Sequence, residues 1–374
     1  MAGLSERNEW DWYLDSAELD LSRLDDSCWP AALADLDKSL LQPIFSTDFT
    51  RQRAEIAWGR GKTRAVVEAA LDLGKVLAGD AEEEICELEL ELRQGEPGAL
   101  LELAVELAAD LPLMPCDISK AERGYRLFDP ASYAIAPDTQ KLLAETPLDG
   151  AFAALAWSLL GSSQRLAEQY RFNGHWRLLQ DWLQQLVDLR ALLGSLGQAV
   201  PRASTRELRT ALDALINDWR PRMEQGEHDE QVRQAAPQAF RAELDQPRWG
   251  LFSLSASRWL LDKAWTAGRN ERAGRQGGAA VGKWLQRQLG DEARDIPLER
   301  AQYEPALLAE QLPRLQRMLV WLRLARGVLE LADVDRLYGE LAKLAQLAAG
   351  DDLQELSNQA HTVLALKPWK ALLK

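Results

Sequence analysis

The sequence predicts an α+β protein, with an antiparallel β region in the first third of the chain and an all-helical region in the rest. Apolar and polar residues alternate in several runs before residue 93, which is the period of a half-buried strand. After the Asp129-Pro130 break, apolar residues recur every three or four positions, the period of an amphipathic helix. A length of 374 residues gives room for two such domains.

Four alternating runs predict strands, at residues 8–14, 49–56, 65–73 and 85–92. Each run gathers its charged side chains on one face. The clearest is the last, where Glu87, Glu89 and Glu91 oppose Cys86 and three leucines. Glycine-containing stretches at 59–63 and 77–81 predict turns, and leucines at helical spacing in 98–111 predict a helix that covers the sheet.

Helical periodicity predicts the elements of the second region. The expected helices lie at 148–172, 174–196, 204–221, 228–244, 252–267, 299–330 and 332–348. The Ser/Gly/Arg-rich stretch 268–278 predicts a loop. Because the chain holds fourteen tryptophans and only seven phenylalanines, we interpret the indoles as residues that fill the core.

The charge is unevenly distributed along the chain. Residues 1–130 hold 28 acidic and 13 basic side chains, whereas residues 131–374 hold 30 and 31. The acidity of the first part disfavours nucleic-acid binding, which requires cations to neutralise phosphates. Three scattered cysteines, the absence of an apolar signal core and the absence of an 18-residue apolar window predict a cytoplasmic protein that does not bind membranes.

The charged faces of the predicted strands have two interpretations. Glu87 and Glu89 lie on one side with Cα atoms about 7 Å apart, and two such carboxylates repel each other unless a cation lies between them. Mg²⁺ prefers oxygen ligands and often bridges carboxylates to phosphate, and Arg51 and Arg53 offer forked donors for phosphate oxygens. The strands therefore either line a site for a metal and a polyanion, or form an open sheet whose charged face meets only water.

Four segments occur in a characteristic order: 41–51, 68–74, 85–92 and 118–125, the last with Ser119-Lys120 ahead of Arg123-Gly124-Tyr125. Together they resemble the CYTH, or triphosphate-tunnel, family, and more narrowly the bacterial inorganic triphosphatases that carry a C-terminal CHAD domain. The resemblance implies an eight-stranded β-tunnel that binds inorganic triphosphate or polyphosphate. It also implies hydrolysis of the terminal phosphoanhydride with Mg²⁺ or Mn²⁺.

Transferred position by position, the resemblance assigns roles to individual side chains. Glu87 and Glu89 would be metal ligands and, with Lys120, catalytic residues. Arg51, Arg53 and Lys120 would bind phosphate, and the further acidic tunnel residues would be Glu9, Glu68 and Asp72. In such a site the metal and the cations stabilise charge on the phosphates while a water attacks the terminal phosphorus.

The chain departs from the family pattern at its start. The family opens with a Glu-x-Glu-x-Lys strand and basic strands, whereas here Met1 lies seven residues before Asn8 in the region that resembles the fifth strand. The resemblance therefore implies that residues 1–129 form the C-terminal half of a tunnel, with an open edge that favours self-association. Either the start is placed too late or the protein is naturally shortened and has lost catalysis. We expect no hydrolysis by this chain alone.

Segments 189–202, 259–265 and 311–318 resemble the CHAD part of the same fusion. This implies a linker at 130–147 and two antiparallel helical bundles over 148–374. CHAD domains are associated with polyphosphate binding through histidine and basic side chains, but this chain has only three histidines and lacks the H-x-x-R-V-x-x-R-R-L-R signature. The alternative function is a non-enzymatic helical module that binds polyphosphate or protein, with a remnant tunnel. Arg314, Arg317, Arg323 and Arg326 form either a basic stripe or a salt-bridged helix face.

Overall fold

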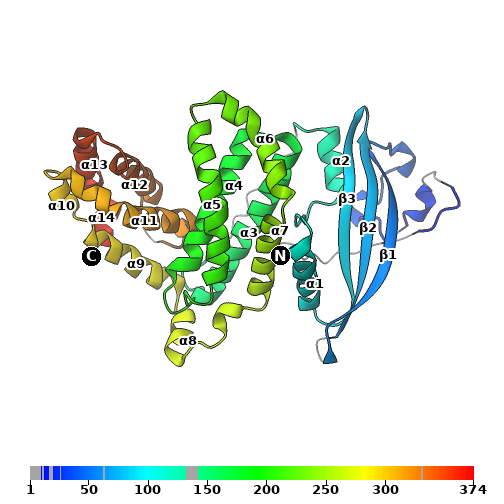
Figure 1. Ribbon diagram of the computed structural model, residues 1–374, viewed down its shortest axis with the longest axis horizontal. Helices are drawn as coiled ribbons and strands as arrows, with labels where there is room; N and C mark the ends of the chain where they lie inside the picture. Colours follow the sequence, from blue (N-terminus) through cyan, green and yellow to red (C-terminus); the bar gives the residue numbers. More distant parts are fainter. Residues whose placement is uncertain are drawn as a thin grey trace. The chain divides into compact units, whose positions relative to one another are not determined.

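The computed structural model describes residues 10, 12–16, 20–25, 27–61, 64–131, 142–329 and 332–374, without the side chain of residue 326. These residues form two compact units. The first holds the described residues up to 103 and residues 116–131, and the second holds residues 104–115, 142–329 and 332–374. A three-stranded antiparallel sheet followed by a mostly helical region confirms the predicted α+β class (Figure 1).

The sheet has the order β1-β2-β3. Its strands are β1 (Ser46–Trp58), β2 (Ala65–Ala78) and β3 (Ala81–Gln94), which contain the three predicted runs after residue 48 and are longer than predicted. The β2–β3 turn places Gly79 at φ +58°, a left-handed conformation that glycine adopts without a Cβ clash. β1 and β3 are the edges of the described sheet.

The strand predicted at 8–14 is wrong for the part of that run that the structure describes. Residues 10 and 12–14 belong to no strand, and Tyr13 is exposed. Alternation shows that a segment would suit a pleated sheet, but a strand also needs a neighbour to complete its hydrogen-bond ladder. Short 3-10 turns follow instead, η1 (Leu21–Arg23), η2 (Ala31–Leu33) and η3 (Lys38–Leu40). Glu9 lies outside the described residues.

The helix that contacts all three strands is α2 (Lys120–Phe128). α1 (Gly98–Asp110), which matches the helix predicted at 98–111, precedes it. α2 packs against the charged face of the sheet, the face on which Arg51, Asp72 and Glu87 stand side by side in the ladder. Around Asp72, burial is the reverse of what alternation suggests, because Asp72 on this face is 0% exposed whereas Leu73 and Leu88 on the other face are 42% and 36% exposed. Towards the start of β2 the other face is buried as well, with Val67 at 0%.

From residue 148 on, the second unit contains five long helices in succession. They are α3 (Leu148–Asn173), α4 (Trp176–Ser195), α5 (Arg206–Gly226), α6 (Glu230–Leu244) and α7 (Pro247–Leu261). η5 (Ala264–Thr266) and α8 (Glu271–Gly277) follow, so the loop predicted at 268–278 is partly helical. Asn270 explains this difference, since its side chain caps α8 by accepting from the Ala273 N–H at 2.9 Å.

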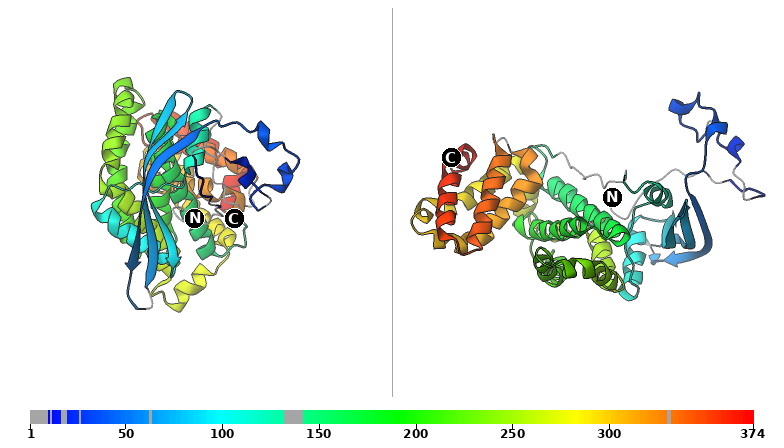
Figure 2. Two further views of the ribbon diagram at one scale, coloured as in Figure 1. Left: turned by 90° about the vertical axis from the view of Figure 1, so that its right-hand side faces the viewer. Right: turned by 90° about the horizontal axis from the view of Figure 1, so that it is seen from above.

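The remaining helices form a second group beside the first (Figure 2). They are α9 (Val281–Asp295), α10 (Leu298–Ala301), α11 (Leu312–Ala325), α12 (Val334–Ala348), α13 (Leu353–Ala365) and α14 (Lys367–Leu372), with the 3-10 segments η6 (Pro305–Gln311) and η7 (Arg326–Val328). The long helix predicted at 299–330 is therefore divided into shorter pieces. Of the helices in the described ranges, none combines the length and the apolar character that crossing a bilayer requires.

Aromatic rings fill the centre of the α3–α7 group, as interpreted from the tryptophan content. Trp182 is fully buried and makes edge-to-face contacts with Trp219, Phe240 and Trp249 at centroid separations of 5.2 to 5.9 Å. Such pairs add about 0.5–1.5 kcal/mol each beyond the area that they bury. This unit consequently has a core of its own.

Candidate functional site

Charged side chains from β1, β2, β3 and α2 converge at one point on the charged face. The Lys120 ammonium lies 2.7 Å from Asp72 Oδ2, 2.9 Å from Glu87 Oε2 and 2.8 Å from Glu89 Oε1. Because Asp72 pairs with Glu87 in the ladder and Glu89 stands two residues further along β3, the register alone brings the three carboxylates together. The structure thus assembles four of the predicted site residues.

Arg51 completes this cluster from the edge strand. Its Nε and Nη2 atoms lie 2.7 and 2.6 Å from the two oxygens of Asp72, a forked arrangement that fixes the guanidinium plane. Nη2 also lies 2.6 Å from Glu89 Oε2. We call Arg51, Asp72, Glu87, Glu89 and Lys120 the charged cluster.

Hydrogen bonds within the charged cluster shift the pKa values of Asp72, Lys120 and Arg51 in the direction that keeps these groups ionised. The hydrogen bonds from Arg51 lower the pKa of Asp72 below its usual value, against the effect of burial, and Lys120 lowers it further. Burial by itself would lower the pKa of Lys120, but its bonds to Asp72, Glu89 and Glu87 prevail and raise it. The bonds to Asp72 likewise raise the pKa of Arg51.

The N-terminus of α2 holds Lys120 in this position. Ser119 is the N-cap, and its hydroxyl accepts a hydrogen bond from the Glu122 backbone N–H at 3.1 Å, so that the helix begins at Lys120. One turn later, a Cβ at Gly124 would overlap the ring of Phe45. The absence of a side chain there lets the helix approach the start of β1 closely.

Two buried arginines attach α2 to β3 beside the charged cluster. Arg123 Nε lies 2.8 Å from Glu83 Oε1, and Arg123 also donates to Glu87 and to the Glu84 carbonyl. Arg126, which is fully buried, lies 3.0 Å from both oxygens of Glu83. Neither arginine was among the predicted site residues. The available signal was the three-residue spacing of Lys120, Arg123 and Arg126, which puts three cations on one helix face.

Arg53 and Glu68, two predicted site residues, lie outside the charged cluster. Arg53 Nε is 3.8 Å from Glu68 Oε1, and its side chain is 56% exposed. Glu68 pairs more closely with Arg93 Nη2, at 2.9 Å, and this bond lowers the pKa of Glu68. These side chains occupy the same face of the sheet further along the strands.

The three carboxylates of the charged cluster fit a hard divalent cation. One oxygen from each of Asp72, Glu87 and Glu89 can be chosen so that all lie within 4.8 Å of one another. An all-carboxylate donor set is the kind that Mg²⁺ and Mn²⁺ prefer. The Lys120 ammonium, which contacts all three residues, shows that the arrangement accepts a positive charge.

The residues of the charged cluster lie in a part of the chain that matches a known protein family. Residues 1–125 match the CYTH domain family. A stretch of 92 residues is 39% identical to an inorganic triphosphatase from Haemophilus influenzae. This match covers 25% of the present chain and 25% of the relative, so the chain spans about a quarter of the length of that protein.

Proposed function

We propose that residues 1–125, as a CYTH domain, bind inorganic triphosphate together with Mg²⁺ or Mn²⁺ on the charged face, within the lineage that hydrolyses the terminal phosphoanhydride. The convergence of Arg51 and Lys120 with three carboxylates is the observation that carries the proposal. Three carboxylates alone would repel a polyanion, whereas a divalent cation held beside Arg51 and Lys120 would attract one.

Each member of the charged cluster has a proposed role. Asp72, Glu87 and Glu89 hold the divalent cation, which when bound supplies positive charge to the phosphate oxygens. Arg51 keeps its fork on Asp72 and orients that carboxylate, while its exposed edge faces phosphate. Lys120 binds a phosphate oxygen. Arg53 and Glu68 lie along the same face, where Arg53 would contact a more distant part of the phosphate chain.

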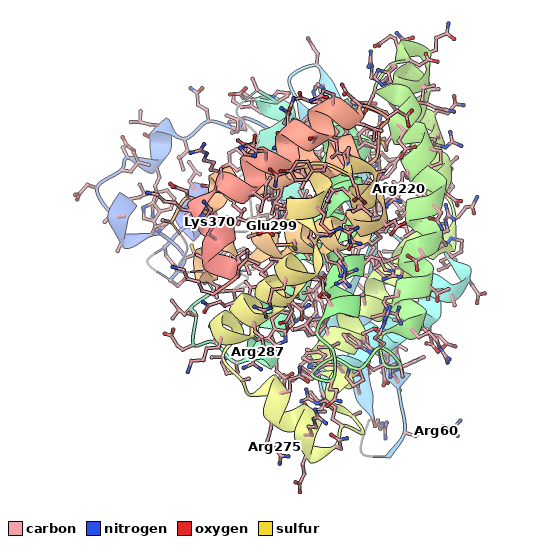
Figure 3. All side chains as sticks on the ribbon, turned by 90° about the vertical axis from the view of Figure 1, so that its left-hand side faces the viewer. Arg60, Arg220, Arg275, Arg287, Glu299 and Lys370 are labelled. Carbon is pink, nitrogen blue, oxygen red and sulfur yellow. The ribbon has the colours of Figure 1, made fainter. Side chains whose placement is uncertain are left out.

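For the second unit we propose a CHAD-like domain at 148–374, joined by a linker at 130–147 to the CYTH part at 1–129. The basic side chains of this unit support anion binding less than the charged cluster does, because several of them form ion pairs with acidic side chains. Arg314 and Arg317 bind Glu292 at 3.0 and 2.8 Å, and Arg323 Nε binds Asp188 at 2.7 Å. The exposed Arg220, Arg275, Arg287 and Lys370 stand well apart on different helices (Figure 3). We therefore place phosphate binding on the sheet.

We expect different outcomes for the binding of tripolyphosphate by this chain and for its hydrolysis. The described sheet is open, so protein groups from the strands would contact a phosphate chain on one side only. Catalysis of phosphoryl transfer depends on groups arranged around the transferred phosphate. We consequently expect tripolyphosphate binding with little or no release of phosphate.

Calorimetric titration of tripolyphosphate, with Mg²⁺ or Mn²⁺ held constant, tests the proposal. Glu87→Gln should weaken binding about tenfold or more because it removes a charged metal ligand. Glu84→Gln is the matched control, since it makes the same change on the same strand but on the opposite, exposed face. Equal binding by both variants, or no binding by the wild type, would refute the proposal. Rapid metal-dependent turnover would instead refute the expectation of binding without hydrolysis.

A further inference from the structure

The Lys120 ammonium occupies the point that the three carboxylates share. It contacts one oxygen each from Asp72, Glu87 and Glu89, at 2.7 to 2.9 Å. The same three residues form the group of carboxylates in the described chain that could hold a metal ion. The Lys120 ammonium and a divalent cation would therefore compete for the same carboxylate oxygens and could not both bind them at once.

The attachment of α2 does not depend on Lys120. The helix start is capped by Ser119, and Arg123 and Arg126 bind Glu83 on β3 independently. The lysine side chain is a flexible stem of four carbons, so its ammonium can leave the carboxylates while the helix stays in place. Arg51 differs, because its fork holds Asp72 through both oxygens.

Charge favours exchange of the ammonium for a divalent ion. The ammonium supplies a single positive charge to the three carboxylates, of which Asp72 and Glu89 also pair with Arg51, and Glu87 also pairs with Arg123. A divalent ion in the same place would attract these oxygens more strongly, because it carries twice the charge. Lys120 is also the first residue of α2, where the positive end of the helix dipole disfavours an ammonium and favours an anion.

From these observations we infer that Lys120 is a built-in competitor of the metal, and that metal binding displaces its ammonium and frees it to bind phosphate. The inference rests on the metal part of the proposed function. It makes binding ordered, with the metal first and phosphate second. By linkage, phosphate must raise the affinity for the metal by the same factor by which the metal raises the affinity for phosphate.

Metal affinity without phosphate tests the competition directly. Free Mn²⁺ is measured by electron paramagnetic resonance for the full chain and for Lys120→Met. Loss of the competitor should tighten Mn²⁺ binding by roughly five- to 150-fold, the usual range of coupling between two ligands. Lys75→Met is the matched control, because Lys75 lies on β2 with its side chain on the opposite face, paired with Glu82. This control should leave the affinity unchanged.

A second measurement uses the wild-type chain and does not depend on how a variant folds. Reductive methylation of individual lysines is followed by mass spectrometry with and without Mg²⁺. Methylation at Lys120 should become severalfold faster with Mg²⁺, and methylation at Lys75 should not change.

The outcomes separate this inference from the proposed function. Mn²⁺ binding by the wild type with no tightening in Lys120→Met, or no change in Lys120 methylation, overturns the inference alone. If neither the wild type nor Lys120→Met binds Mn²⁺, the metal part of the proposed function fails, and the inference fails with it. Tightening in Lys120→Met without any affinity for tripolyphosphate supports the inference and refutes the proposed substrate.

Discussion

At the scale of single residues, Asp72 holds the charged cluster together. It is the fully buried carboxylate of the three, and it bonds to Arg51 through both oxygens and to Lys120 through one. A buried carboxylate of this kind is costly to leave unpaired, and so are the cations around it once it is removed. Asp72 thus contributes to stability as well as to the proposed site.

Asp72→Asn should lower the free energy of unfolding by about 1.5–3 kcal/mol, because two partly buried cations lose the more buried of the two carboxylates that they share. Urea unfolding of the full chain measures the change. Asp48→Asn provides the comparison, since Asp48 is exposed on β1 and should change stability by less than about 0.5 kcal/mol. Equal effects of the two substitutions would show that the charged cluster adds no stability.

At the scale of elements, the site depends on how closely α2 approaches the sheet. Gly124 faces Phe45, and the neighbouring Tyr125 ring packs edge-to-face on Phe45 at 5.1 Å. The helix carries Lys120 to the carboxylates only while this contact is kept. A side chain added at Gly124 should therefore disturb the charged cluster without touching it.

Gly124→Ala should destabilise the protein by about 1–3 kcal/mol through overpacking against Phe45. In a double-mutant cycle, Phe45→Ala should remove most of the added cost, because the new methyl group then has room. Gly339→Ala is the control, because we expect it to change the free energy of unfolding in the opposite direction. Gly339 lies in α12 with open space around it, so alanine there should add up to about 1 kcal/mol of stability. Additive effects of Gly124→Ala and Phe45→Ala would contradict this account.

At the scale of the whole molecule, each of the two compact units carries an ion-pair network of its own residues. In the second unit, Glu292 on α9 binds Arg314 and Arg317 on α11. Burial raises the pKa of Glu292, but the bonds from Arg317 and Arg314 prevail and leave this pKa below its usual value. The stabilisation is consequently present at neutral pH and is lost as the pH falls through the lowered pKa of the folded state.

We expect Glu292→Gln and Asp72→Asn to affect different unfolding transitions, because each unit has its own contacts. Ten of the fourteen tryptophans lie after residue 137, so fluorescence mainly reports on the second unit. Glu292→Gln should shift the fluorescence transition at pH 7, with an effect that fades in acid, whereas Asp72→Asn should shift a second calorimetric transition. One transition moved equally by both substitutions would show that the chain unfolds as a single unit.

Residue patterns predicted part of the site and missed the rest for identifiable reasons. Alternation placed Arg51, Asp72, Glu87 and Glu89 on the charged sides of their strands, since side-chain direction in a strand follows sequence parity. The position of Lys120 over them depends on how α2 packs, which local periodicity does not encode. Alternation was misleading for residues 10 and 12–14, which have no partner strand in the described sheet. The loop prediction at 268–278 failed in part because Asn270 caps a helix within a stretch rich in loop-forming residues.

The face of the sheet opposite the charged cluster leaves apolar side chains exposed, and this affects the stability of the sheet. Leu73 and Leu88 are exposed on that face, whereas the Asp72 carboxylate on the other face is fully buried. Because about two fifths of each leucine is still exposed, full burial would add roughly 0.6–1.2 kcal/mol per leucine. A further gain in stability is therefore possible behind the site, where an apolar surface could cover the two leucines without contacting any member of the charged cluster.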